Sequence, residues 1–271
     1  VGASDYFAVQ QQIEGLNVAD LAWGTSSAKS ITLSFLAYSS LTGTFGGAIG
    51  NSAGTRSYPF TYSIPVANTW TTISVTVAGD TSGTWLTTTG IGMYVRFGLG
   101  VGSTYSGTAN TWGSSNYLSA TGAGSVVGTG SATFYITGVQ LEKGSTATSF
   151  DYRPYGTELQ LCQRYFIKYS AGDAGTANVG YTAYSMGYAE SATVSKQQVT
   201  LPVKMRASPT VAFNGSIILN PISSSASLSF SNLGTQQGYI QITSSGMTAG
   251  TAQMLFTNND STAYVSFSSE L

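Results

Sequence analysis

Few side chains in this sequence are suited to acid–base or nucleophilic chemistry. The chain has 271 residues, with no histidine and a single cysteine, Cys162. Without histidine, Ser–His–Asp and Cys–His catalytic arrangements and imidazole zinc sites are excluded. The eleven acidic residues show no spacing typical of a catalytic pair, which in glycoside hydrolysis needs carboxyl groups about 5 to 10 Å apart. We therefore expect a protein that is not an enzyme and has no catalytic residues.

Metal and nucleotide sites also lack their usual signatures. No Gly-rich loop is followed by Lys-Ser or Lys-Thr, as a phosphate-binding loop would require. Calcium usually takes two or more carboxylates, and Asn258-Asn259-Asp260 is more typical of a hairpin turn. We predict no metal site and no cofactor, with a structural calcium ion left open as the alternative. We expect Cys162 to be a small buried hydrophobic side chain, the alternatives being an intermolecular disulfide and a reactive thiol.

Aromatic residues are the remaining candidates for ligand contact. Tyr105, Trp112 and Tyr117 fall in a Gly/Ser/Thr-rich loop, 103–119. Exposed rings in such a loop can stack on sugar faces or on protein partners, so all three are predicted ligand-binding residues. Trp112 has a second interpretation, which we favour: the ring folds back and closes one end of a β-sandwich.

A second tyrosine group lies later in the chain. Tyr181, Tyr184 and Tyr188 are spaced by three and four residues, but the glycines around them favour a loop or an irregular strand. Tyr181 and Tyr184 are added to the predicted ligand-binding residues. The other tryptophans are predicted to be core or hairpin residues: Trp23, Trp70 and Trp85.

Composition limits the kinds of partner. Charged residues make up 8% of the chain, against roughly 25% in an average soluble protein. No stretch approaches the ~20 apolar residues of a spanning helix, so membrane insertion is not expected. The formal net charge of −1 offers no electrostatic attraction for nucleic acid. Hydrophobic residues at 42% and aromatics at 12% supply enough apolar surface for a folded core.

The elements that would position these residues are strands. Apolar residues alternate with polar ones at four places in the first half: Ile31/Leu33/Phe35, Ile73/Val75/Val77, Ile91/Met93/Val95/Phe97 and Phe134/Ile136. At the fourth place Tyr135, Thr137 and Val139 are on the opposite side. The stretches 43–54 and 100–115 are turn-rich, and a further turn is predicted around 17–23. Several short strands with such punctuation favour an antiparallel sandwich or jelly roll.

A boundary is predicted at Arg153-Pro154-Tyr155-Gly156. Thr157 is placed to cap a short helix through Glu158–Tyr165, with Leu159, Cys162 and Phe166 on one side. A second set of strands follows, in which Pro202 and Pro209 are expected at strand starts or edges. The predicted strands are 199–205, 211–219, 228–230, 239–242, 253–256 and 264–267.

Charge is concentrated near this boundary. Residues 151–206 hold 10 of the 21 charged residues, and beyond Arg206 only Asp260 and Glu270 remain. We interpret the concentration as a solvated junction between domains. The alternative is a set of ion pairs between subunits that fix the register of an oligomer.

Several segments carry a family resemblance. They are Gln11–Gly15, SITLSF at 30–35, NTWTTISVTV at 68–77, and most specifically FYITGVQLEKGSTATSFDYRP at 134–154 with LCQRYF at 161–166. Together, over about residues 6–166, they resemble the carbohydrate-binding-module-like jelly roll of bacteriophage tail fibre and related virion proteins. The resemblance implies a sandwich that the VQLEKG strand closes. Sugar-binding relatives usually carry calcium-binding acids before that strand, where this chain has Thr137-Gly138, so no calcium site is carried over.

A shorter resemblance follows at 201–211. LPVKMRASPTV is similar to the entry of small β domains that end many phage fibres and commonly assemble as trimers. The predicted fold is therefore all-β, a jelly-roll β-sandwich followed by a second antiparallel β domain, which we expect to be trimeric. The predicted domains are residues 1–154 (carbohydrate-binding-module-like jelly roll), 155–170 (short helix and linker) and 171–271 (C-terminal β-sandwich for oligomerisation or recognition).

Together these expectations predict a structural protein of a bacteriophage virion, on the exterior of the particle. We expect a tail fibre or receptor-binding element that contacts the host surface. One alternative is a head-decoration or capsid-fibre protein with no ligand, and another is the carbohydrate-binding domain of a polysaccharide-degrading enzyme. The expected partners are other virion proteins, a host cell-surface glycan and two further copies in a homotrimer. The run Ile217, Ile218 and Leu219 looks too apolar for the wet face of a lone strand, which favours the trimer.

Overall fold

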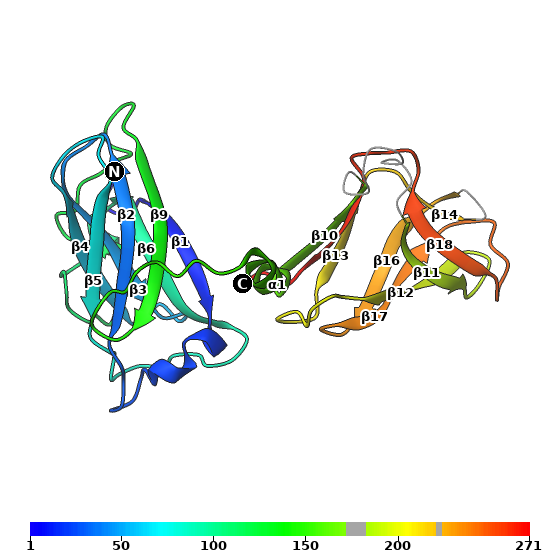
Figure 1. The fold of residues 1–271 in the computed structure, drawn as a ribbon, viewed down its shortest axis with the longest axis horizontal. Coiled ribbons are helices and arrows are strands. Elements are labelled where there is room, and N and C mark those ends of the chain that lie inside the picture. The colour runs from blue at the N-terminus through cyan, green and yellow to red at the C-terminus, as the bar shows by residue number, and fades with distance from the viewer. Residues whose placement is uncertain (172–182, 221–223) are drawn as a thin grey trace. The chain divides into compact units, whose positions relative to one another are not determined.

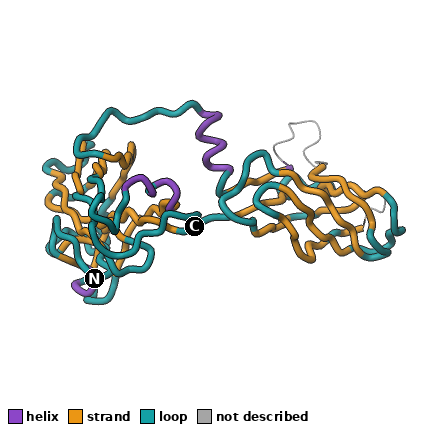
Figure 2. The backbone as a smooth tube through the Cα atoms, turned by 90° about the horizontal axis from the view of Figure 1, so that it is seen from below, coloured by secondary structure: helices purple, strands orange, loops and turns teal. Residues whose placement is uncertain are grey.

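The computed structural model describes residues 1–171, 183–220 and 224–271. The chain divides into two compact units, unit 1 (Val1–Tyr152) and unit 2 (Arg153–Glu270), and each is described by itself. Strands dominate both units (Figures 1 and 2). None of the described helices is both long and apolar enough to cross a membrane. The predicted all-β class is confirmed.

Unit 1 consists of two antiparallel sheets. Sheet I has the strand order β1 (Tyr6–Glu14), β6 (Ile91–Val101), β3 (Gly43–Gly50) and β4 (Ser57–Ile64). Sheet II has the order β5 (Thr71–Val77), β2 (Ile31–Ser39) and β9 (Phe134–Lys143). The short elements are the 3-10 turns 15–17, 19–21 and 103–105 and a two-residue parallel pair, β7 (Ser106–Gly107) with β8 (Ser119–Ala120).

The pairing of these strands is nested. β3 pairs with β4, β2 with β5, and β1 with β6, so the chain from β1 to β6 is one long hairpin that is rolled into two sheets. β6 also pairs with β3, and β9 closes sheet II against β2. This is the connectivity of a jelly roll. The predicted jelly roll is therefore present in unit 1.

The core of unit 1 lies between the two sheets. Phe35 of β2 forms edge-on contacts with Tyr62 of β4 and Phe97 of β6, with ring centroids 5.1 and 5.0 Å apart. Such contacts follow from period-two alternation, because every second residue of a strand faces inward. The inward positions predicted for β2, β5 and β6 are in the core.

The sequence predicted a turn-rich stretch at 43–54, but most of this stretch is a strand. Its first eight residues form β3, a central strand of sheet I. At Gly47 an added Cβ would lie 2.2 Å from the carbonyl oxygen of Arg96 and 2.5 Å from the ring of Phe60. The glycines therefore permit close packing of neighbouring strands. In the sequence, glycines with this role look the same as glycines that mark a turn.

Unit 2 also consists of two antiparallel sheets. Sheet III has the order β15 (Ser224–Ser225), β14 (Ile217–Asn220), β18 (Ala252–Thr257), β11 (Ala183–Ala189), β12 (Val194–Thr200), β17 (Gln237–Thr243) and β16 (Ser227–Leu233). Sheet IV has the order β10 (Phe166–Ser170), β19 (Tyr264–Ser268) and β13 (Thr210–Asn214). Both sheets contribute to one core, for example Ile240 and Leu255 from sheet III and Val265 from sheet IV.

Contrary to the prediction, the apolar run is buried and not exposed: Ile217, Ile218 and Leu219. They are 3%, 5% and 0% exposed in β14. β14 has neighbours on both sides, β15 and β18, so it is not a lone strand. The apolar run is thus accounted for within the chain, and it no longer supports a trimer.

Other strand boundaries in unit 2 differ from the prediction. The strand predicted at 199–205 is β12 at 194–200, and it ends before Pro202, which has no N–H to donate. The strand predicted at 211–219 is two strands, β13 and β14, because the chain turns at Gly215 (φ 77°) and passes from sheet IV to sheet III. β10 and β11 were not predicted. Pro209 directly precedes β13, as expected.

The helix α1 (Tyr155–Gln163) begins after Pro154, so Thr157 lies inside the helix and does not cap it. α1 buries no residue. Leu159 and Phe166 are 40% and 42% exposed, and Cys162 is exposed rather than buried. The prediction for Cys162 was wrong because it assumed that the apolar side of α1 packs on a core. α1 and β10, predicted as a helix and linker, both belong to unit 2.

Candidate functional site

The loop 103–119 lies in unit 1, but its three predicted ligand-binding rings face different neighbours. Tyr105 is half-buried and meets Tyr6 edge-on, with centroids 5.1 Å apart. Tyr117 packs on Gly107, where an added Cβ would lie 2.4 Å from its ring. Trp112 belongs to a third group, described next. The three residues therefore do not form one site.

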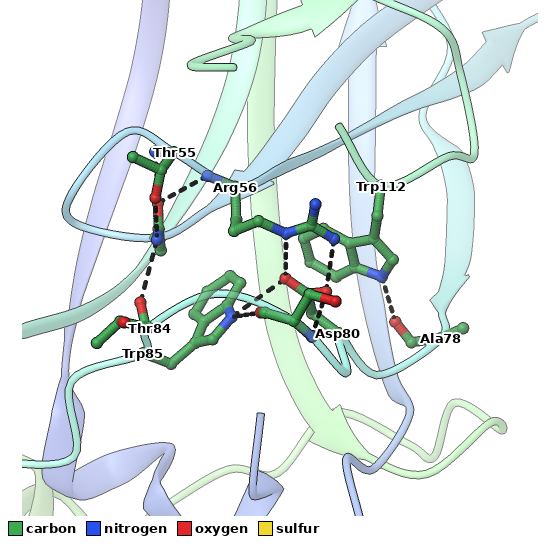
Figure 3. A network of polar contacts seen from close by, with 9 residues as sticks. Thr55, Arg56, Ala78, Asp80, Thr84, Trp85 and Trp112 are labelled. Atoms are coloured by element: carbon green, nitrogen blue, oxygen red, sulfur yellow. Dashed lines mark hydrogen bonds and ion pairs between the residues drawn. The ribbon is translucent and has the colours of Figure 1, made fainter. Parts of the chain in front are cut away.

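Trp112 closes one end of the sandwich. Its ring meets Trp23, Trp85 and Tyr58 edge-on at centroid distances of 5.3, 5.7 and 5.2 Å. Its Nε1 donates a 2.9 Å hydrogen bond to the carbonyl oxygen of Ala78 (Figure 3). The favoured interpretation of Trp112 agrees with this geometry. The prediction of Trp112 as a ligand-stacking residue is not supported, because these contacts occupy the ring and the indole N–H.

The polar contacts beside Trp112 are also structural. Arg56 donates from Nε and Nη2 to the two carboxylate oxygens of Asp80, at 2.8 and 2.6 Å (Figure 3). The hydrogen bond to Asp80 raises the pKa of Arg56. Trp85 Nε1 also donates to Asp80, at 3.2 Å. Every strong acceptor of Asp80 is thus satisfied within the protein, and the network holds the connections at this end of the sandwich.

The second tyrosine group is only partly described. Tyr181 lies outside the described residues. The hydroxyl of Tyr184 donates a 3.1 Å hydrogen bond to the carbonyl oxygen of Ala263. Its ring packs against the core of unit 2 and lines a small pocket beside Tyr169 and Thr200. Tyr184 thus has a structural role, although one side of its ring borders this pocket.

The charged stretch 151–206 forms contacts within the chain. Lys196 pairs with Glu190, and Arg153 Nη1 lies 3.3 Å from a carboxylate oxygen of Glu158. Arg206 Nε donates a 2.7 Å hydrogen bond to the carbonyl oxygen of Ser269. These partners account for much of the concentrated charge without a second subunit. Ion pairs between subunits stay an untested alternative.

Metal ligands do not gather in the described ranges: no group of three or more His, Cys, Asp or Glu side chains is close enough to hold an ion. Asp260 accepts hydrogen bonds from the backbone N–H groups of Ser216 and Thr262. The predicted turn at 258–260 exists, with Asn259 at φ 50°. It is not a hairpin, since it joins β18 of sheet III to β19 of sheet IV.

A cluster of three aromatic rings, two exposed and one half-buried, lies on the outer face of sheet II. Tyr38 is 5.5 Å from Trp70 and 5.6 Å from Tyr135, measured between ring centroids. Trp70 and Tyr135 are 48% and 54% exposed. We call these three residues the aromatic platform. Trp70 was predicted to be a core or hairpin residue, and this was wrong because it lies in the connection between β4 and β5, which belong to different sheets.

Strand geometry places two of the three rings. Phe35 and Ala37 face the core from β2, so Tyr38 faces outward. Tyr135 is its cross-strand partner on β9 and faces the same way. The alternation at 134–139 already put Tyr135 on the outer side. The sequence did not show that Tyr38 and Tyr135 would be paired, because that register depends on the folded sheet.

The connections around the platform are held together by hydrogen bonds. Ser39 accepts a 2.7 Å bond from the backbone N–H of Asn68, which is in a left-handed turn (φ 56°) just before Trp70. The hydroxyl of Ser39 donates to the carbonyl oxygen of Thr133, and Ser40 accepts from the N–H of Thr133. The three segments that carry the rings are thus joined to one another, so the rings are oriented before any ligand arrives.

The surroundings of the platform are polar but uncharged. In register with Leu36 of β2 lie Thr72 of β5 and Thr137 of β9, both exposed. After Thr137 the strand bulges at Gly138 (φ 59°), and Phe150 from the returning chain lies beside Gly138. An exposed aromatic surface beside threonine hydroxyls suits a neutral ligand with an apolar face and hydroxyl groups.

Known proteins give no further guide to this site. No protein-family model matches the chain, and no curated protein matches it either.

Proposed function

We propose that this chain is a non-enzymatic structural protein on the exterior of a bacteriophage particle, whose unit 1 contacts a glycan of the host surface. The setting rests on the sequence resemblance over residues 6–166. The recognition role rests on one observation, the aromatic platform of Tyr38, Trp70 and Tyr135. Sugar rings have apolar faces that stack on aromatic side chains, and two of these rings are about half exposed.

The ligand that fits best is a neutral sugar. The platform and the threonines beside it carry no charge, so a neutral ligand loses no ion solvation when it binds there. Stacking contributes little per ring, and tail fibres gain avidity from several copies. Assembly as a homotrimer stays a prediction, although the apolar run that first favoured it is buried within unit 2.

A glycan array tests this role. We expect the wild-type chain to bind a subset of neutral host glycans, and Trp70→Ala to weaken that binding by about fivefold, since stacking of this kind is worth about 1 kcal/mol. Tyr155→Ala is the matched control, because Tyr155 is 81% exposed on α1 and lies in unit 2. Circular dichroism establishes that both variants fold. Equal loss in both variants, or no loss in Trp70→Ala, contradicts the proposal.

A further inference from the structure

A buried arginine on sheet I has no acidic partner. Arg96 of β6 is 4% exposed. Within the described ranges no carboxylate forms an ion pair with it, in contrast to Arg56, which binds Asp80. Burial lowers the pKa of Arg96, and the phenol groups of Tyr94 and Tyr6 oppose this effect. A buried cation normally has a counter-ion, because removing its hydration is costly.

Neutral groups occupy two of the three guanidinium nitrogens. Nε donates a 2.8 Å hydrogen bond to the amide oxygen of Gln10 on β1. Nη1 donates to the amide oxygen of Asn116 at 2.9 Å and to the carbonyl oxygen of Tyr117 at 3.4 Å. The guanidinium lies over the ring of Tyr94, 4.4 Å from its centroid. Its orientation is therefore fixed from three sides.

The third nitrogen is left for a ligand. Nη2 of Arg96 forms no hydrogen bond to any described residue. Nη2 is also not fully buried. Among the described residues, the fully buried side-chain atoms without a hydrogen-bond partner are the hydroxyl of Tyr62 and the amide oxygen of Gln253, and Nη2 is not one of them. An unpaired, solvent-reached N–H₂ group on a fixed guanidinium is a preorganised donor for an anionic oxygen.

The sequence builds this position with glycine and aromatic residues. Gly50 lies beside Arg96, and an added Cβ there would be 3.1 Å from Nη1, so a larger residue would crowd the guanidinium. Gln10 and Asn116 are exposed amides next to it. The edge-on pair of Tyr6 and Tyr105 lies at the start of β1, whereas Gln10 is in the middle of that strand.

We propose that Arg96 binds the carboxylate of an acidic sugar residue, with Nη2 as the donor to the carboxylate and the amides of Gln10 and Asn116 available for sugar hydroxyls. This site is on sheet I and does not depend on the aromatic platform, which is on sheet II. The carboxylate supplies the counter-charge that no described residue provides. The amide groups and the tyrosine rings nearby favour a sugar over a bare anion.

The test uses a substitution that places a carboxylate of the protein itself beside Arg96. Gln10→Glu is nearly isosteric and puts a carboxylate where the amide oxygen already lies 2.8 Å from Nε. We expect Gln10→Glu to raise the melting temperature and to weaken binding of glucuronate at least about tenfold, since the internal carboxylate replaces the external one. Gln11→Glu is the matched control, because it makes the same charge change on the neighbouring residue, whose side chain points to the other face of β1.

Calorimetric titration of the full chain with three probes distinguishes the outcomes. Glucuronate is expected to bind wild type and Gln11→Glu with similar affinity, glucose to bind much more weakly, and acetate more weakly than glucuronate. Equal binding of glucose and glucuronate overturns the role of Arg96. Acetate that binds as tightly as glucuronate overturns the assignment to a sugar. A lower melting temperature of Gln10→Glu also overturns the proposal, because a guanidinium without a counter-ion gains from a carboxylate.

Discussion

At the residue scale, Asp80 and Arg96 show two ways in which unit 1 accommodates a buried charge. Asp80 is 1% exposed and accepts hydrogen bonds from Arg56, Trp85 and the N–H of Ser82. Among the described residues, the hydrogen-bond acceptors of Arg96 are neutral: Gln10, Asn116 and the carbonyl oxygen of Tyr117. A satisfied buried pair holds its surroundings in one arrangement, whereas an unsatisfied charge is a place where a ligand can bind.

We expect Asp80→Asn to destabilise unit 1 strongly. The substitution leaves the Arg56 guanidinium, which is 18% exposed, without its counter-ion, and breaking a largely buried pair in this way costs about 3 kcal/mol. Chemical denaturation followed by tryptophan fluorescence measures the effect, because Trp23, Trp85 and Trp112 surround the pair. Lys143→Gln removes the exposed pair with Asp20 (54% and 60% exposed side chains) and should change little. Equal effects of the two substitutions would contradict the prediction.

At the element scale, single glycines and single acids decide how strands connect. Gly138 allows the bulge in β9 beside the aromatic platform, and Gly215 separates β13 from β14. Asp260 joins the connection at Gly215–Ser216 to the one that follows β18, through a 2.8 Å bond from the N–H of Ser216. Such short-range polar contacts fix loops that no apolar core holds.

We expect the turn at Asp260 to make the stability of unit 2 depend on pH in acid. Hydrogen bonds from Thr262 and Ser216 lower the pKa of Asp260 below its ordinary value of 3.8. A lowered carboxyl pKa adds stability that is complete above the ordinary value and is lost as pH falls through the lower folded value. We expect Asp260→Asn to be less stable than wild type at pH 7 and to differ less from it at about pH 2. Urea denaturation at both pH values measures this.

Glu158→Gln is the control for Asp260→Asn. Glu158 is also in unit 2, but its side chain is 52% exposed in a surface pair with Arg153. Glu158→Gln should leave the dependence of the stability of unit 2 on pH unchanged. If the gap between wild type and Asp260→Asn were as large in acid as at pH 7, the lowered pKa of Asp260 would not be the cause.

At the scale of the whole molecule, the chain consists of two β units that each have a core of their own. Both units use antiparallel sheets, and the candidate ligand surfaces described above belong to unit 1. The short segment 201–211, whose sequence resembles the entry of fibre-ending domains, lies in unit 2. We propose that unit 1 recognises a ligand, and the fold alone does not assign a role to unit 2.

Immunogold labelling of intact phage particles tests the proposed setting. We expect antibodies against the chain to label the outside of the particle at the tail, since recognition of the host occurs there. Labelling at the head would favour the decoration alternative and remove the receptor-binding role. Antibody absorbed with the purified chain is the control. An absence of label on particles that contain the polypeptide would contradict an exterior position.

The sequence by itself determined the all-β class, and it predicted a jelly roll and a boundary at residues 153–156. Alternating apolar residues and turn residues act locally, so they can be read from neighbouring positions. The inward faces of β2, β5 and β6 follow from that alternation. The same reasoning placed Tyr135 on an outer face.

Only the tertiary structure decided which residues meet. The platform joins Tyr38, Trp70 and Tyr135 from three separate segments, and the Arg96 site joins β1, β6 and the loop before β8. The exposure of Cys162 and the burial of Ile217–Leu219 likewise depend on what packs beside each element. Strand register and sheet pairing are long-range properties, because they are set by contacts between residues far apart in the chain.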